Sequence, residues 1–146
     1  MPENIANKIY TIRGQKVMLD SDLAEIYGYT TKAFNQQVKN NKEKFDEDFR
    51  FQLTKFEVEE LSRSKFLTSM QVAGTKGGRA YLPYVFTEQG IYMLMTVLKG
   101  KLATKQSKML IRLFKTMKDY IVENKALLDY RGSLEIVDRI SGNTEK

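Results

Sequence analysis

One segment constrains the fold more than any other, because between Leu102 and Tyr130 the sequence contains neither Gly nor Pro. These two residues are the ones that most readily end or kink a helix. Side chains along the segment follow alternating spacings of three and four, which is typical of one amphipathic helix. The stripe consists of Leu110, Leu113, Met117, Tyr120, Asn124 and Leu127. We therefore expect a long helix after a small folded domain, with Gly132 as its end.

The stripe can serve two purposes, and the sequence does not choose between them. It can pack on the protein's own domain. It can also pair residues 101–130 of two copies in a coiled-coil-like homodimer, with the polar Asn124 at a core position. A second stripe carries cations that are either solvated or directed at a DNA backbone: Lys101, Lys105, Lys108, Arg112 and Lys115.

The composition excludes several classes of function. The 146 residues include no Cys and no His, which excludes disulfide frameworks, zinc fingers, thiolate nucleophiles and imidazole bases. The formal net charge of +6 suits a polyanionic partner. The longest apolar run is far too short to span a bilayer, and the N-terminus does not resemble a signal peptide. We therefore expect a cytoplasmic protein with no cofactor, no metal site and no membrane partner.

Short elements are expected before the long helix. Two β-leaning runs, residues 9–12 and 16–19, flank Gly14 and predict a hairpin. A helix over residues 23–27 should follow, ended by Gly28. Its candidate N-caps are Asp20, Ser21 and Asp22.

Similar local signals predict the elements between residue 50 and the long helix. Residues 50–53 predict a strand, and Thr54 should cap a helix over residues 55–61, with Glu57 placed to complete a capping box. A loop over residues 62–80 and an extended run over residues 81–86 come next. Pro83 indicates that this run is an edge strand, because proline cannot donate a ladder hydrogen bond. Thr87 should cap a helix that runs through Leu98 to Gly100.

Residues 22–41 carry the most informative pattern. A short helix, a glycine turn and a second helix over residues 32–41, capped by Thr30 or Thr31, have the spacing of a helix-turn-helix. Other pairs of antiparallel helices need similar residues, so the pattern alone does not decide between them. The expected core of the pair is Leu23, Ala24, Gly28, Phe34 and Val38.

The other side of the second helix favours DNA recognition. Lysine can bind guanine or phosphate, and amide side chains can pair with adenine. No acidic residue occurs between Ile26 and Lys42, whereas a merely solvated helix face usually mixes Glu with Lys. The candidate contacts are Thr31, Lys32, Asn35, Gln36, Lys39, Asn40 and Lys42.

A glycine-rich segment over residues 74–79 is a second candidate contact. Its three glycines would let the backbone approach a phosphate closely, and Lys76 and Arg79 would supply positive charge. This suits a basic wing beside a recognition helix, and it suits a mobile surface hairpin equally well.

Several blocks of sequence together resemble the KilA-N superfamily, and within it the branch named after the N-terminal domain of phage "open reading frame six". The blocks are Val17-Met18-Leu19-Asp20, Asp22-Leu23-Ala24-Glu25-Ile26-Tyr27-Gly28, Phe51-Gln52-Leu53-Thr54, Gly77-Gly78-Arg79, Leu82-Pro83-Tyr84 and Phe86-Thr87-Glu88-Gln89-Gly90. The resemblance implies a DNA-binding domain of phages, and of bacteria that carry phage-derived genes. Such domains often occur in regulators and antirepressor-like proteins. Ala80 departs from the pattern, because a second Arg often follows Arg79 there.

These observations predict an α+β fold. Residues 8–98 should form a KilA-N-like domain with a helix-turn-helix core and short β-hairpins, resembling a winged helix. Residues 99–131 should form the long basic helix, and residues 132–146 a short amphipathic turn and a frayed tail. We expect a non-enzymatic, sequence-preferring double-stranded DNA-binding protein, a phage-derived transcriptional regulator.

Two alternatives remain open from the sequence. An antirepressor-type module would bind another regulator protein through the long helix and the acidic block 43–60. A nuclease is less favoured, because Gly90-Ile91-Tyr92 matches only the start of one nuclease signature and no metal-binding cluster of carboxylates is evident.

Overall fold

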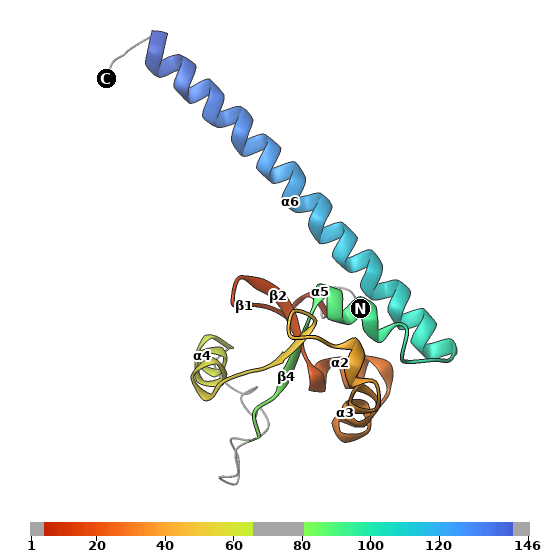
Figure 1. The fold of residues 1–146 in the computed structure, drawn as a ribbon. Coiled ribbons are helices and arrows are strands. Elements are labelled where there is room, and N and C mark those ends of the chain that lie inside the picture. Colours follow the sequence, from red (N-terminus) through yellow and green to blue (C-terminus); the bar gives the residue numbers. More distant parts are fainter. Residues whose placement is uncertain (1–4, 66–80, 142–146) are drawn as a thin grey trace. The chain divides into compact units, whose positions relative to one another are not determined.

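The computed structural model describes residues 5–65 and 81–141 (Figure 1), with side chains described up to residues 63 and 127. Lys76 and Arg79 therefore lie outside the described residues. The chain divides into two compact units, Met1–Leu110 and Ile111–Lys146. The fold is α+β, as expected, with a small antiparallel sheet and a long C-terminal helix.

Four strands form the sheet in the order β1-β2-β4-β3, and each adjacent pair is antiparallel. Their bounds are β1 Ile9–Ile12, β2 Gln15–Leu19, β3 Arg50–Gln52 and β4 Tyr84–Thr87. The predicted hairpin is confirmed. Arg13 and Gly14 have φ angles of 55° and 75°, which suits a two-residue turn between twisted strands.

The expectation of an edge strand at residues 81–86 is wrong. Strand β4 lies between β2 and β3. Pro83 does not disturb the ladder because it precedes the strand, and its carbonyl accepts a hydrogen bond of 2.9 Å from the Leu53 N–H. A proline directly before a central strand costs no ladder hydrogen bond.

The helices are α2 Asp20–Tyr27, α3 Thr31–Asn40, α4 Lys55–Lys65, α5 Glu88–Leu94 and α6 Lys101–Ser141, with a 3-10 turn at Lys42–Lys44. Threonines cap three of them as predicted: Thr30 accepts from the Ala33 N–H, Thr54 from Glu57 and Thr87 from Gly90. The cap expected before α2 is wrong, because that helix begins at Asp20 and Leu19 has no capping side chain.

Three helix ends differ from expectation. Helix α4 continues to Lys65 into the expected loop. Helix α5 stops at Leu94, and the hydrogen bonds tighten to three-residue spacing there, as in Met95 N–H to Tyr92 O. Helix α6 passes Gly132 and reaches Ser141, so the helix end expected at Gly132 and the short turn expected after it are wrong. The part of the expected frayed tail over residues 142–146 lies outside the described residues. A single glycine costs about 1 kcal/mol relative to alanine inside a helix, which its helix-forming neighbours can offset.

The sheet has two differently covered faces. On one face Val17, Phe51 and Val85 form a core with Val58 and Leu61 of α4. On the other face Phe86 meets Phe34 of α3 and Phe45 edge-on, at ring-centroid distances of 5.6 and 5.8 Å. Helices α3 and α4 therefore pack on opposite faces of the sheet.

The first turns of α6 belong to the first unit and hold the end of α2. Gln106 donates to the Ile26 carbonyl at 2.8 Å, and the Tyr27 and Ser107 hydroxyls lie 2.7 Å apart. A Cβ atom on Gly28 would lie 3.1 Å from a Leu102 methyl carbon. The compact unit thus extends to Leu110, past the boundary expected at residue 98.

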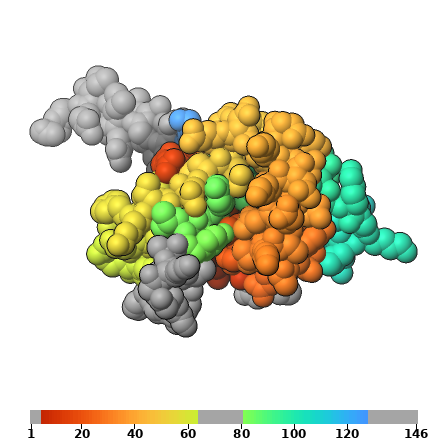
Figure 2. Space-filling view, turned by 60° about the horizontal axis from the view of Figure 1, so that its bottom comes forward, coloured from red at the N-terminus to blue at the C-terminus, as the bar shows by residue number. Residues whose placement is uncertain are grey.

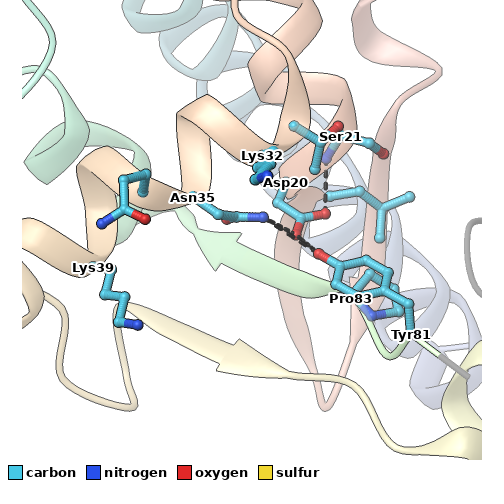
Figure 3. Close-up of a pocket in the computed structure, with 10 residues that line it drawn as sticks. Asp20, Ser21, Lys32, Asn35, Lys39, Tyr81 and Pro83 are labelled. Atoms are coloured by element: carbon cyan, nitrogen blue, oxygen red, sulfur yellow. Dashed lines mark hydrogen bonds between the residues drawn. The ribbon is translucent and has the colours of Figure 1, made fainter.

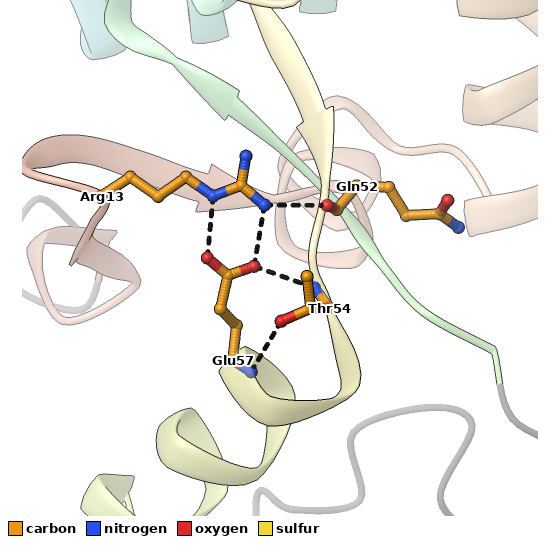
Figure 4. Close-up of polar contacts among 4 residues, drawn as sticks. All are labelled: Arg13, Gln52, Thr54 and Glu57. Carbon is orange, nitrogen blue, oxygen red and sulfur yellow. Dashed lines mark hydrogen bonds and ion pairs between the residues drawn. The ribbon is translucent and has the colours of Figure 1, made fainter.

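A salt bridge links the β1–β2 turn to the start of α4 (Figure 4). The Arg13 guanidinium donates to both carboxylate oxygens of Glu57, at 2.8 and 3.0 Å, and to the Gln52 carbonyl. Glu57 also accepts from the Thr54 N–H at 2.8 Å, which completes the predicted capping box. The hydrogen bond from Arg13 lowers the pKa of Glu57, and the bonds from Thr54 add to this effect.

The lowered pKa makes stability depend on pH. Because the folded state favours the Glu57 carboxylate, its contribution is present above the usual pKa of 4.5 and is lost as the pH falls below it. Glu57→Gln should lower the free energy of unfolding by about 1 kcal/mol at pH 7, and the difference from the wild type should shrink towards pH 3. Urea denaturation at several pH values measures this.

Glu60→Gln is the matched control. Glu60 pairs with Arg63 on the same helix at 3.0 Å, and both side chains are exposed. An exposed pair of this kind contributes less than about 0.5 kcal/mol. A pH-independent effect of Glu57→Gln would contradict the assignment.

Candidate nucleic-acid interface

Helices α2 and α3 form a tightly joined pair. Gly28 ends α2 in the left-handed conformation, with φ 79°, and Thr30 caps α3. The side chains expected in the core of the pair, Leu23, Ala24, Phe34 and Val38, are at most 1% exposed. With one side of α3 anchored by Phe34 and Val38, the other side must face outward.

The outward side of α3 carries the cations and amides that the sequence predicts. Lys32, Gln36, Lys39 and Asn40 are exposed, as is Lys42 in the turn that follows, and Thr31 is half-buried. Figure 2 shows the segment around residues 31–40, in orange, at the surface of this face. Gln36 donates to the Asn40 side-chain oxygen at 3.0 Å, which leaves the Gln36 oxygen and the Asn40 amide group available to a ligand.

Asn35 does not share this exposed face. Its amide group donates to the Asp20 carboxylate at 2.9 Å and to the Tyr81 hydroxyl at 3.3 Å (Figure 3). Its side-chain oxygen is buried and has no hydrogen-bond partner among the described residues. The pairing of Asn35 with a base stays a prediction, and in this structure its amide group is engaged with Asp20 and Tyr81.

The buried Asp20 carboxylate is the centre of this polar cluster. Asp20 is fully buried and accepts from the Ser21 and Tyr84 N–H groups, at 2.8 and 3.3 Å, in addition to Asn35. The Tyr81 hydroxyl donates to the same carboxylate. Burial, followed by this hydrogen bond, raises the pKa of Tyr81, so the hydroxyl stays protonated and remains a donor.

A hollow of about 490 Å³ lies over the cluster. Its lining joins the start of α2, the outward side of α3 and the residues before β4: Leu19, Asp20, Ser21, Thr31, Lys32, Asn35, Gln36, Lys39, Tyr81 and Pro83. Five of the predicted contact residues therefore line this hollow. Sequence reasoning missed Asp20 and Tyr81. These two residues are separated from Asn35 by 15 and 46 positions in the sequence, and contacts over such separations give no periodic signal.

The described part of the chain contains neither a carboxylate cluster suited to a metal ion nor a membrane-spanning helix. No group of three or more Asp or Glu side chains there could hold a metal ion. No helix there is long and apolar enough to cross a membrane.

Comparison with protein families identifies the domain to which most of the chain belongs. The model of the ORF6N domain matches residues 7–97, which is more than half of the chain. The chain belongs to the ORF6N family. None of the curated proteins and none of the solved structures compared with the chain matched it. The ORF6N match ends before α6, and it contains the sheet, α2, α3 and the Asp20 cluster.

The Asp20 cluster should stabilise the ORF6N domain measurably. Tyr81→Phe removes one donor to a buried carboxylate, and we expect a loss of about 1.5 kcal/mol in the free energy of unfolding. We take the low end of the range for hydrogen bonds to charged groups because Tyr81 is 36% exposed. Chemical denaturation measures it. Lys99→Gln is the control, because Lys99 is an exposed residue between α5 and α6 and should show no change. Equal effects of the two variants would contradict the role of the cluster.

Proposed function

We propose that this protein is a sequence-preferring double-stranded DNA-binding protein, a non-enzymatic, phage-derived transcriptional regulator. The observation that carries the proposal is the outward side of α3, where Lys32, Gln36 and Lys39 are exposed and surround a hollow. No acid occurs on this helix, so nothing on it opposes the approach of phosphates.

The chemistry of these side chains supports both affinity and selectivity. Lysines bind phosphates or the acceptor atoms of guanine, and Gln36 can pair with adenine in the major groove. A helix of ten residues anchored by Phe34 and Val38 is suited to enter that groove. The proposed winged-helix arrangement would add Lys76 and Arg79, and a relationship with the KilA-N superfamily is consistent with it.

Charge reversal on α3 should weaken DNA binding. Lys32→Glu and Lys39→Glu should each raise the Kd for duplex DNA by roughly tenfold at low salt, and each should reduce the salt-dependence slope by about 1. Gln36→Ala should instead reduce discrimination between sequences by about 1–3 kcal/mol, with little change in non-specific binding. Fluorescence anisotropy on duplexes selected from a random pool measures both effects.

Lys55→Glu is the matched control for this series. It makes the same change in net charge, but Lys55 is an exposed residue of α4, which packs on the opposite face of the sheet. The proposal fails if the wild type binds duplex DNA no better than an unrelated protein of similar charge. It also fails if Lys55→Glu weakens binding as much as the α3 variants do.

We further propose a homodimer through residues 101–130. Leu110 is fully buried, so the part of the stripe available to a second copy begins at Leu113. Tyr120 and Leu127 are 66% and 50% exposed, and Leu113, Met117 and Asn124 are half-buried. A helical dimer would cover these apolar groups and explain their heptad spacing.

A charged residue in the stripe should dissociate the dimer. Tyr120→Glu with Leu127→Glu should convert a dimeric mass to a monomeric one, because burying two carboxylates against a partner is costly. Light scattering coupled to gel filtration measures the mass. Val122→Glu is the control, since Val122 is 64% exposed but lies on the other side of the helix. A wild-type monomer would refute the dimer.

The exposed apolar side chains of α6 also favour one alternative, an antirepressor-type module that binds another regulator. Capture of such a regulator that tolerates Lys32→Glu and Lys39→Glu, but is lost with Tyr120→Glu and Leu127→Glu, would support this alternative over DNA binding.

A further inference from the structure

Two arginines in the first unit are stacked in the same way on aromatic rings. The Arg13 guanidinium lies 4.0 Å from the centre of the Phe51 ring, and the Arg50 guanidinium lies 4.0 Å from the centre of the Tyr84 ring. Stacking on a ring fixes the plane of a guanidinium and leaves its N–H edge free to donate. The two residues differ in whether a carboxylate accepts hydrogen bonds from that edge.

Arg13 is neutralised by a carboxylate, whereas among the described residues Arg50 has no such partner. Arg13 makes its two-pronged contact with Glu57, whereas no carboxylate of the described residues lies within ion-pair distance of Arg50. Asp20 acts on Arg50 only through its field, and its oxygens already accept four hydrogen bonds. Residues 66–80 contain no Asp or Glu that could supply a partner.

The strand register places the two arginines on different sides of the sheet. Arg50 pairs with Phe86 across β3 and β4, and Tyr84 lies two residues from Phe86, so all three share one face. This is the face on which Phe34 of α3 packs. Arg13 instead stacks on Phe51 and bonds to Glu57, on the α4 side.

The surroundings of Arg50 fit an anionic ligand that comes from outside. Burial lowers the pKa of Arg50, since part of its hydration is lost without a carboxylate in exchange. The charge of the Asp20 carboxylate opposes this effect, and Asp20 lines the hollow beside Lys32 and Lys39. A phosphate has the geometry for a two-pronged contact with a fixed guanidinium.

We propose that Arg50 binds a backbone phosphate of duplex DNA next to the outward side of α3. The inference rests on the proposed DNA-binding function and adds a residue from the sheet to the helix contacts. Since Arg50 comes from a strand, it would fix the position of the duplex relative to the sheet, while Gln36 reads a base edge. Phosphate contacts of this kind set the register without selecting a sequence.

The salt dependence of DNA binding tests the proposal. Loss of one phosphate contact should reduce the slope of log K against log [NaCl] by about 0.9. We expect this for Arg50→Gln, and for Arg50→Met, whose unbranched side chain can still cover the Tyr84 ring. Arg50→Lys should keep the slope of the wild type, because the charge remains. Arg13→Gln is the matched control: it should lower the thermal stability and leave the slope unchanged.

The outcomes separate this inference from the function on which it rests. If the wild type does not bind duplex DNA, both fail. If the wild type binds and both neutral variants at Arg50 keep its slope, only the role of Arg50 is refuted. If Arg13→Gln reduces the slope as much as Arg50→Gln, the effect is not local to the α3 side and the inference is also refuted. Titrations below the melting temperature of every variant exclude unfolding as the cause.

Discussion

The arrangement of the ORF6N domain depends on one buried charge. The Asp20 carboxylate is fully buried, and a buried charge is costly unless hydrogen bonds satisfy it. Its donors come from the start of α2, the middle of α3 and both sides of Pro83. Satisfying Asp20 therefore requires α3 and β4 to take fixed positions, which the apolar contact between Phe34 and Phe86 alone would not impose. The burial of Phe34 and Val38 turns Lys32 and Lys39 outward, and the Asp20 hydrogen bonds fix the position of α3.

Local signals in the sequence predicted most of the elements. Glycine turns and threonine caps act within four residues, and for this reason the β1–β2 hairpin, the end of α2 at Gly28 and the caps of α3 and α4 were all predictable. The errors arose where distant residues decide the outcome. Pro83 signals an edge strand by itself, but its position one residue before β4 makes it compatible with a central strand.

The candidate site was predictable in part for the same reason. Helical periodicity identified the exposed Lys32, Gln36 and Lys39, since Phe34 and Val38 fix which side of α3 is buried. Periodicity also placed Asn35 on that stripe, but it could not reveal that a carboxylate 15 residues away would hold the amide inward. Arg50 was hidden because it belongs to an acidic stretch of sequence, whereas in the fold its neighbours come from other strands and helices.

The two stacked arginines show how a fold separates structural cations from available ones. Both use an aromatic ring of the sheet to fix the guanidinium, so stacking alone does not distinguish their roles. The two arginines differ in their carboxylate partners. Glu57 neutralises Arg13 on the α4 side, whereas the Asp20 oxygens near Arg50 on the α3 side already accept hydrogen bonds from other groups. Lys32, Lys39 and Arg50 therefore lie together on the α3 side of the sheet, although the charges nearly balance along residues 1–98. The proposed DNA contact depends on this arrangement in space, which net charge per segment does not capture.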